Sequence, residues 1–371
     1  MRPLRVALIG SRGVPARYGG FETLMEEVGR RLADRGLEVT VYCRSHYTDR
    51  ELKEHRGMRL VVLPTLRGKY LDTPVHTLLS VLHAGSELYD AAVVVNSANA
   101  LFVPLLRSSG IPTALNVDGI EKRRAKWGWP GRLVYAISER LATLVPDVLV
   151  TDAEVIARHY LERYGAPSET ITYGVDPAPL PPGKVMRQLG LEPREYFLYV
   201  SRFEPENNPH RVAEAYKHVG GDLPLVMVGD APYADKFISS FALDADPRIL
   251  FPGPVYGEGY RELLSNALAY IQATEVGGTH PALVEAMGYG AAVLVNDTPE
   301  NREVAVDCAT YFDVSRPRTL GNALEDAAAN RERTRLAGER AAEHARRHYR
   351  WEGVTDRYES LVRTLAGRVG A

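Results

Sequence analysis

The chain has 371 residues, of which 45% are hydrophobic and 25% charged, with a formal net charge of −2. This length exceeds one ordinary core and predicts two domains, and the charge balance gives no overall basic footprint for nucleic acid. Two cysteines, Cys43 and Cys308, exclude a disulfide framework and a cysteine zinc site. Because the apolar runs are far shorter than the about 20 residues that span a bilayer, and the first is too short for a secretory signal, we expect a cytoplasmic protein, at most peripheral at the inner face of the membrane.

The first half of the sequence alternates between short apolar runs and amphipathic stretches. Predicted strands cover 5–10, 38–44, 58–64, 91–96, 112–117 and 147–152, and a predicted helix covers 21–36. Strands separated by helices predict a parallel sheet with crossover connections.

A proline-rich stretch, 173–184, separates this half from a second strand–helix series and predicts a linker. Further strands are predicted within 196–203, 223–230, 248–255, 269–275 and 291–297, and helices from Arg316 onward. The predicted fold is therefore α/β, with two Rossmann-like doubly wound domains, 1–172 and 173–350, facing across a cleft. In such sheets ligands bind at the carboxyl ends of the strands.

The stretch GSRGVPARYGGFE, 10–22, carries four glycines directly after the first predicted strand. Glycines there allow a ligand to approach the backbone, and the following helix offers free N–H groups to an anion. The spacing is not that of the dinucleotide fingerprint. A phosphate contact and a long turn with structural glycines both remain open.

Two stretches of the second half carry similar signals. Arg202 follows a predicted strand and suits a bidentate phosphate contact, or an ion pair with Glu204 or Glu206. A Gly-Gly turn at 277–278 precedes a predicted helix that begins near Pro281. Glu285, about one turn into that helix, suits the two hydroxyls of a ribose, or a favourable interaction with the helix dipole.

Four stretches in this order, 11–23, 116–128, 201–208 and 275–290, resemble retaining glycosyltransferases of the two-Rossmann-domain GT-B type. The resemblance covers essentially the full length. It is to the family-4 group, and within it to a bacterial rhamnosyltransferase-like subgroup.

The resemblance implies a role for each matching residue. A catalytic set would comprise Asp118, Glu22 and Arg202. The donor-binding set would comprise Gly19, Gly20, Glu206, Asn207, Gly277, Gly278, Thr279, His280 and Glu285. Three positions depart from the family pattern: Asn207 replaces a lysine, Gly277 a glutamate and Asp118 a histidine. Asp118 would act on the acceptor hydroxyl or the sugar ring, or simply cap the next turn.

The segment 121–132 contains five basic residues and two of the three tryptophans. It predicts either a contact with an anionic membrane surface or a solvated loop whose tryptophans pack inward. The residues assigned to this acceptor or membrane side are Lys122, Arg123, Arg124, Lys126 and Trp127. By resemblance, the last segment, 351–371, crosses back onto the first domain, with Trp351 as its anchor.

The predicted function is a retaining, metal-independent glycosyltransferase without a cofactor. Its donor would be a nucleotide-diphosphate sugar, with rhamnose from dTDP-rhamnose as the first candidate. Its acceptor would be a glycan or a lipid-linked saccharide, and no nucleic-acid partner is expected. A GDP- or UDP-sugar donor, a nucleotide-sugar epimerase and a non-catalytic nucleotide-sugar-binding protein remain open alternatives.

Overall fold

The computed structural model describes residues 2–368 except 18, 69, 125–127 and 231–234. Two compact units divide the chain. The first unit comprises Met1–Arg123, Trp127–Tyr173 and Trp351–Ala371, and the second comprises Arg124–Lys126 and Gly174–Arg350.

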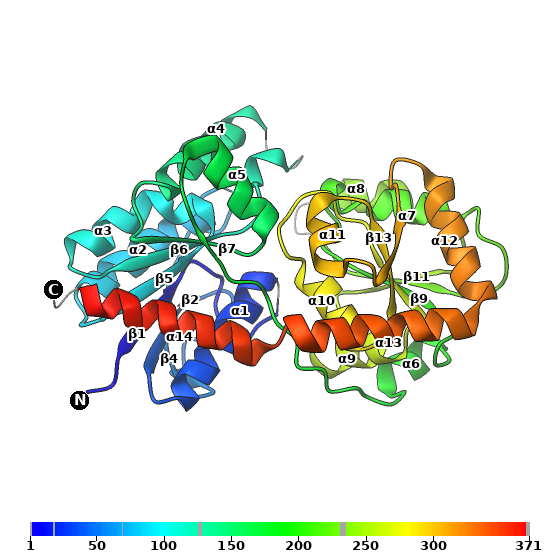
Figure 1. The fold of residues 1–371 in the computed structure, drawn as a ribbon, viewed down its shortest axis with the longest axis horizontal. Coiled ribbons are helices and arrows are strands. Elements are labelled where there is room, and N and C mark those ends of the chain that lie inside the picture. The colour runs from blue at the N-terminus through cyan, green and yellow to red at the C-terminus, as the bar shows by residue number, and fades with distance from the viewer. Residues whose placement is uncertain (1, 18, 69, 125–127, 231–234, 369–371) are drawn as a thin grey trace. The chain divides into compact units, whose positions relative to one another are not determined.

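An eight-stranded sheet forms the centre of the first unit (Figure 1). Its strands are β1 (Arg5–Ile9), β2 (Glu38–Arg44), β3 (Glu54–His55), β4 (Met58–Leu63), β5 (Ala91–Val95), β6 (Thr113–Val117), β7 (Val148–Thr151) and β8 (Glu169–Thr170). The order is β3-β4-β2-β1-β5-β6-β7-β8, and every pair is parallel except the short β3–β4 hairpin. The alternating pattern did not predict this hairpin, because β3 has only two residues.

Helices cover both faces of this sheet, as parallel crossovers require. One layer consists of α1 (Gly20–Asp34) and α14 (Trp351–Gly367). Their apolar side chains pack against strand side chains, and together these form one core. The other layer consists of α2 (Asp72–Gly85), the 3-10 helix η1 (Ser97–Phe102), α3 (Val103–Ser108), α4 (Trp129–Ala142) and α5 (Glu154–Tyr164). A short 3-10 helix, η2 (Glu121–Arg123), precedes α4.

The last helix confirms the predicted return to the first domain. Trp351 is buried in the same core as α1, and the Asn116 amide donates to the Tyr358 hydroxyl at 2.6 Å, tying α14 to β6. Figure 1 shows α14 lying along the first sheet.

The second unit contains a six-stranded, fully parallel sheet. Its strands are β9 (Phe197–Val200), β10 (Leu225–Val228), β11 (Ile249–Gly253), β12 (Ala269–Gln272), β13 (Ala292–Asn296) and β14 (Ala309–Phe312), in the order β11-β10-β9-β12-β13-β14. Its helices are α6 (Lys184–Leu189), α7 (Pro209–Tyr216), α8 (Asp235–Ala242), α9 (Gly257–Asn266), α10 (Pro281–Gly288), α11 (Pro299–Ala305), α12 (Pro317–Ala329) and α13 (Arg331–His348), with a 3-10 turn η3 (Pro205–Asn207). The predicted α/β class with two parallel sheets is confirmed.

Strand order locates the place where each unit would bind a ligand. In the first sheet β1 connects to β2 on one side, and the chain later returns from β4 to β5 on the other side of β1. In the second sheet β9 connects to β10 on one side, and the chain returns from β11 to β12 on the other side of β9. Such a switch point opens a crevice beyond the carboxyl ends of the two central strands. The glycine-rich loop follows β1, Arg202 follows β9, and residues 273–280 follow β12.

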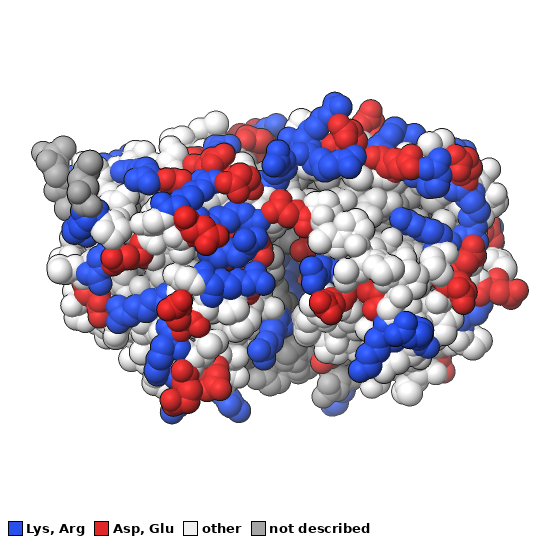
Figure 2. Space-filling view, turned by 90° about the horizontal axis from the view of Figure 1, so that it is seen from below, with Lys and Arg blue, Asp and Glu red and all other residues white. Residues whose placement is uncertain are grey.

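Acidic and basic side chains alternate over the visible face of each unit in Figure 2, consistent with the net charge near zero. Among the described residues, no helix combines the length and the apolar content needed to cross a bilayer.

Candidate active site

The loop after β1 depends on two glycines for its path. Gly10 has φ +109°, and a Cβ there would lie 2.5 Å from the Val95 carbonyl oxygen. Gly13 has φ +126°, and a Cβ there would lie 2.7 Å from the Cβ of Cys43. These two glycines let the loop pack against β5 and β2. Gly19, in contrast, has an extended backbone (φ −164°) that any residue can adopt.

Two carboxylates of α1 accept hydrogen bonds from backbone N–H groups of this loop. A Glu22 oxygen accepts the Arg12 backbone N–H at 2.8 Å, and a Glu26 oxygen accepts the Ala16 N–H at 2.5 Å. Glu22 is only 5% exposed, and this burial raises its pKa, an effect that the Arg12 N–H partly offsets. These hydrogen bonds fix the conformation of the loop without any contact to a ligand. The geometry therefore favours a positioning role for Glu22.

Substituting Glu22 by glutamine tests that role. Glutamine keeps an acceptor for the Arg12 N–H but carries no charge. Because the raised pKa means that the ionised carboxylate disfavours the folded state as pH rises through that pKa, E22Q is expected to keep or raise the melting temperature at pH 7. Turnover should stay within about ten-fold of wild type, since the loop keeps its anchor.

The matched control is Glu26→Gln, which alters the second anchor of the same loop. Melting temperature measured from pH 4 to 8 and steady-state turnover give both readouts. A turnover loss far beyond ten-fold at unchanged melting temperature would instead make Glu22 a direct participant in the reaction.

Asp118 follows β6 and is half-buried beside Tyr173. Burial raises the pKa of Tyr173 well above its usual value, and the nearby Asp118 charge adds to that rise. Asp118 thus lies just beyond the carboxyl end of β6, and its role in the reaction stays a prediction.

The cations predicted for an acceptor or membrane side lie in different surroundings. Lys122 pairs with Glu139 at 2.8 Å. Arg124 is buried and groups with the second unit, where its guanidinium lies 3.8 Å from a Glu206 oxygen. Lys126, Trp127 and the side chain of Arg123 lie outside the described residues. Lys122 and Arg124 are thus engaged in ion pairs rather than presented on an open surface.

Arg202 lies just beyond the end of β9, and its side chain is 33% exposed. Its guanidinium lies 3.9 Å from a Glu204 carboxylate oxygen. The Asn207 amide donates to the Arg202 carbonyl at 2.7 Å, while the Tyr199 hydroxyl donates to the Asn207 carbonyl at 2.7 Å. Asn207, which replaces the family lysine, thus braces the loop that carries Arg202.

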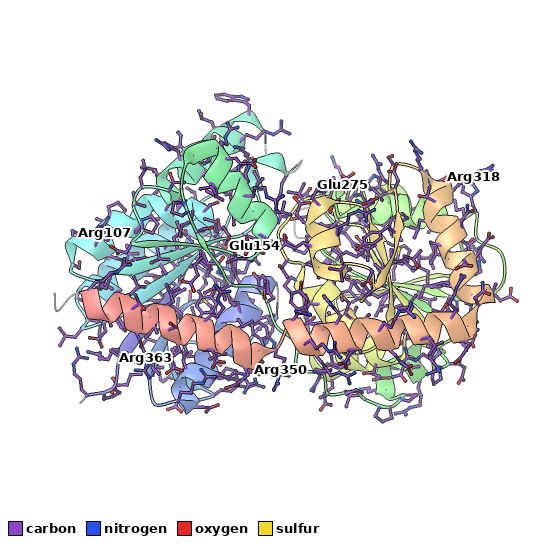
Figure 3. The ribbon with its side chains drawn as sticks, in the orientation of Figure 1. Arg107, Glu154, Glu275, Arg318, Arg350 and Arg363 are labelled. Carbon is purple, nitrogen blue, oxygen red and sulfur yellow. The ribbon has the colours of Figure 1, made fainter. Side chains whose placement is uncertain are left out.

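The loops after β9 and β12 are joined to each other. The Asn208 amide donates to the Ala273 carbonyl at 2.9 Å, and the backbone N–H of Glu275 donates to the Glu206 carbonyl at 3.0 Å. Figure 3 labels Glu275. The Glu206 carboxylate is buried, and neither of its oxygens has a hydrogen-bond partner among the described residues. The two stretches predicted to bind the donor are therefore hydrogen-bonded to each other at the switch point.

The absence of a side chain at position 277 is explained by His280, three residues later in the chain. A Cβ at Gly277 would lie 2.3 Å from Cε1 of the His280 ring, so the imidazole occupies the space that a side chain at 277 would need. Burial, together with the charges of Arg124 and Arg202, lowers the pKa of His280 to about 3. A pKa this far below neutral pH makes the imidazole a weak proton acceptor, which argues against a general-base role for His280.

Glu285 lies in α10 and receives a hydrogen bond from Tyr260. The Tyr260 hydroxyl donates to a Glu285 oxygen at 2.6 Å, and burial raises the pKa of Tyr260 well above its usual value, with the Glu285 charge adding to the rise. The phenol therefore stays protonated and orients the carboxylate. Sequence reasoning missed Tyr260, because it lies on α9, in a stretch with no signal of its own.

A second missed residue is Gly229, directly after β10. It has φ +153°, and a Cβ there would lie 1.9 Å from the Ser201 carbonyl oxygen, next to Arg202. The sequence signal was a glycine that ends the apolar run 223–228.

Alanine at Gly277 is expected to displace the His280 ring and to weaken donor binding about ten-fold, with little loss of folding because the clash is with a side chain rather than with the backbone. If the effect acts through the imidazole, G277A/H280A should bind donor no worse than H280A alone. Calorimetric donor titration of the four proteins completes the cycle. Strictly additive losses would show that the two positions act independently.

Two family models match this chain. "Glycosyl transferase 4-like domain" matches residues 19–173, and "Glycosyl transferases group 1" matches residues 184–344. A search of curated proteins found no match.

Solved structures share the fold at low sequence identity. The sucrose-phosphate synthase from Thermosynechococcus elongatus superposes with a TM-score of 0.82 at 17% identity, over 98% of this chain and 100% of that one. HepE from Anabaena, in complex with UDP and glucose, gives 0.78 at 15% identity, over 98% and 100%. WaaG, a glycosyltransferase involved in lipopolysaccharide biosynthesis, gives 0.73 at 15% identity, over 97% and 99%. With both units matched, the chain belongs to the group 1 glycosyl transferases that have a glycosyl transferase 4-like first domain, and it transfers a sugar from a nucleotide-sugar donor.

Proposed function

We propose that this chain is a retaining, metal-independent glycosyltransferase whose second unit binds the nucleotide-diphosphate part of the donor. The observation that carries this proposal is the convergence of Arg202, the N-terminus of α10 and Glu285 at the switch point of the second sheet. An arginine and free helix N–H groups suit a diphosphate, and a carboxylate suits a ribose diol.

Charge development explains how these groups would promote transfer. The bond from the sugar C1 to the diphosphate oxygen breaks, and a bond from C1 to the acceptor oxygen forms on the same face of the sugar. The acceptor proton passes to the leaving phosphate. The Arg202 guanidinium and the N–H groups of 278–280 would stabilise the negative charge that grows on the leaving group.

The first unit would supply the acceptor side. The glycine-rich loop, fixed by Glu22, would approach the sugar and diphosphate at Gly19 and Gly20. Asp118, at the end of β6, would orient the acceptor hydroxyl or stabilise positive charge on the sugar ring. The acceptor would be a glycan or a lipid-linked saccharide.

The resemblance of the four motifs supports dTDP-rhamnose as the first donor to test. A UDP-sugar is the second candidate, because HepE, which shares this fold, has been solved with UDP and with UDP-glucose. A GDP-sugar would use the same diphosphate and ribose contacts.

Thermal shift with dTDP, UDP, GDP and ADP, each at saturation, tests the proposal. A nucleotide at about 100 times its Kd adds ~2.7 kcal/mol of stability. Selective stabilisation by dTDP would support the rhamnosyl donor, and selectivity for UDP or GDP would replace it. Product that forms without any added acceptor would favour the epimerase, and binding without turnover on any acceptor would favour a non-catalytic protein.

Asp118→Asn is expected to lower turnover about 100-fold while leaving the donor Kd within about two-fold, because the residue acts on the acceptor side of the reaction. The pair of measurements is steady-state turnover and calorimetric donor titration. Unchanged turnover would reduce Asp118 to a turn-capping residue.

A further inference from the structure

Exposed large apolar side chains are unevenly distributed between the two units. Among the described residues, the second unit carries four, Leu243, Tyr256, Val306 and Leu336. The first unit carries fourteen, Leu66, Tyr70, Leu71, Leu78, Leu82, Leu88, Leu101, Leu105, Trp129, Leu133, Val134, Ile137, Leu144 and Leu161. Contiguous exposed apolar surface marks an interaction site rather than ordinary surface.

The two helix layers of the first unit also differ from each other. In their described parts, α1 and α14 carry none of these side chains. Charged side chains pair between them, as where Arg35, at the C-terminal cap of α1, contacts Asp356 at 2.8 Å and Glu359 at 2.7 Å on α14. The exposed apolar residues of the helices therefore gather on the opposite layer.

Helix α4 has an outward face that is apolar. Trp129, Leu133 and Ile137 recur every four residues and are 77%, 53% and 49% exposed. This spacing places them on one face of the helix. Ser138 and Ala142 point the opposite way, into the unit, and are buried. The usual amphipathic pattern, with apolar residues inward, is reversed.

Neighbouring elements of the same layer also carry exposed apolar side chains. Helix α4 packs against η1, which in turn contacts α2 and α3. The exposed apolar residues of those elements are Leu78 and Leu82 on α2, Leu101 on η1 and Leu105 on α3.

The charges that accompany α4 are positive. Arg132 and Arg140 are exposed. Glu139, the one acidic residue of α4, is buried and accepts hydrogen bonds from Lys122 at 2.9 Å, Tyr164 at 2.9 Å and His159 at 2.7 Å. The face thus offers a tryptophan, aliphatic side chains and cations, the combination that favours the headgroup region of an anionic membrane.

We propose that the outward face of α4, defined by Trp129, Leu133, Ile137, Arg132 and Arg140, docks flat on an anionic lipid bilayer. A second copy of the chain fits this face less well, because a symmetric contact would bring the α4 arginines of the two copies together. The proposal goes beyond the proposed function and does not depend on the identity of the donor or acceptor. It places the membrane contact on α4, beyond most of the loop to which the sequence pattern assigned it.

Vesicle flotation of the full chain tests this docking. The probes are vesicles of phosphatidylglycerol mixed with phosphatidylcholine, compared with phosphatidylcholine alone. Wild type should float with the anionic vesicles. L133S/I137S should bind them at least about ten-fold more weakly through lost apolar burial. R132E/R140E should lose about ten-fold or more on anionic vesicles.

The matched control is L243S/L336S, which removes two exposed leucines from the second unit and should bind like wild type. All substituted side chains are exposed, so melting temperatures should stay close to that of wild type. Wild type that stays unbound, or L133S/I137S that binds like wild type, would overturn the proposal. So would a wild-type dimer in light scattering that L133S/I137S converts to monomer, since the occupant would then be a second copy.

Discussion

Replacing Arg202 by alanine is expected to lower turnover by roughly 10³-fold, the size of effect typical when a group that stabilises transition-state charge is removed. The side chain is 33% exposed just beyond the end of β9, and its ion pair with Glu204 is long, at 3.9 Å. Such a distant, partly exposed pair contributes little to stability. The loop itself is held by the Arg202 carbonyl, which alanine retains and to which Asn207 donates. Activity should therefore fall without loss of folding.

Two further variants serve as controls for this test. Arg202→Lys keeps the charge but loses the bidentate fork, so it should recover only part of the turnover. Arg316→Ala removes an exposed arginine paired with Asp313 and should behave like wild type. Steady-state turnover and melting temperature are measured for all three. Turnover of R202A within ten-fold of wild type, with an unchanged melting temperature, would remove Arg202 from the reaction.

Sequence patterns predicted the two sheets because buried parallel strands are continuous apolar runs. The runs 38–44 and 112–117, for example, became β2 and β6 almost residue for residue. The β3–β4 hairpin and β14 (Ala309–Phe312) were not predicted. Short or partly exposed strands carry too few residues for a periodic signal, and their pairing is decided by neighbours that are distant in sequence.

The site was predictable where it depends on position along a strand. Residues that follow central strands gather at one edge of a parallel sheet, so Arg202 and the 273–280 loop could be brought together from the sequence. The need for glycine at 277 was not predictable, because it arises from the space that the His280 ring occupies next to this position. Tyr260 and Gly229 were missed for the same reason, since each acts through a partner on another element.

The site also shows why a departure from a family pattern is difficult to interpret from sequence. Asn207 lacks the charge of the lysine that the family pattern has at this position. In the structure its amide supports the Arg202 carbonyl, so the substitution changes a bracing contact as well as a charge. Whether the lost charge or the hydrogen bond from Asn207 matters more for donor binding depends on loop geometry rather than on residue type.

Gly229→Ala is expected to destabilise the second unit by ~3 kcal/mol or more. The residue combines a φ of +153° with a Cβ position 1.9 Å from the Ser201 carbonyl oxygen. Because the obstacle is backbone, relief requires movement of the β9 loop that carries Arg202. For a domain of this size the melting temperature should fall by roughly 6–12 °C.

Gly253→Ala separates the two causes of that loss. Gly253 has φ +77°, but a Cβ there would meet nothing within 4 Å, so only the backbone conformation is disfavoured. That cost is on the order of 1–2 kcal/mol, a fall of a few degrees. Thermal unfolding of both variants gives the comparison. Equal losses would mean that the Ser201 carbonyl yields easily, whereas a larger loss for G229A, with donor binding reduced in parallel, would show that close packing of Gly229 under the β9 loop sets the position of Arg202.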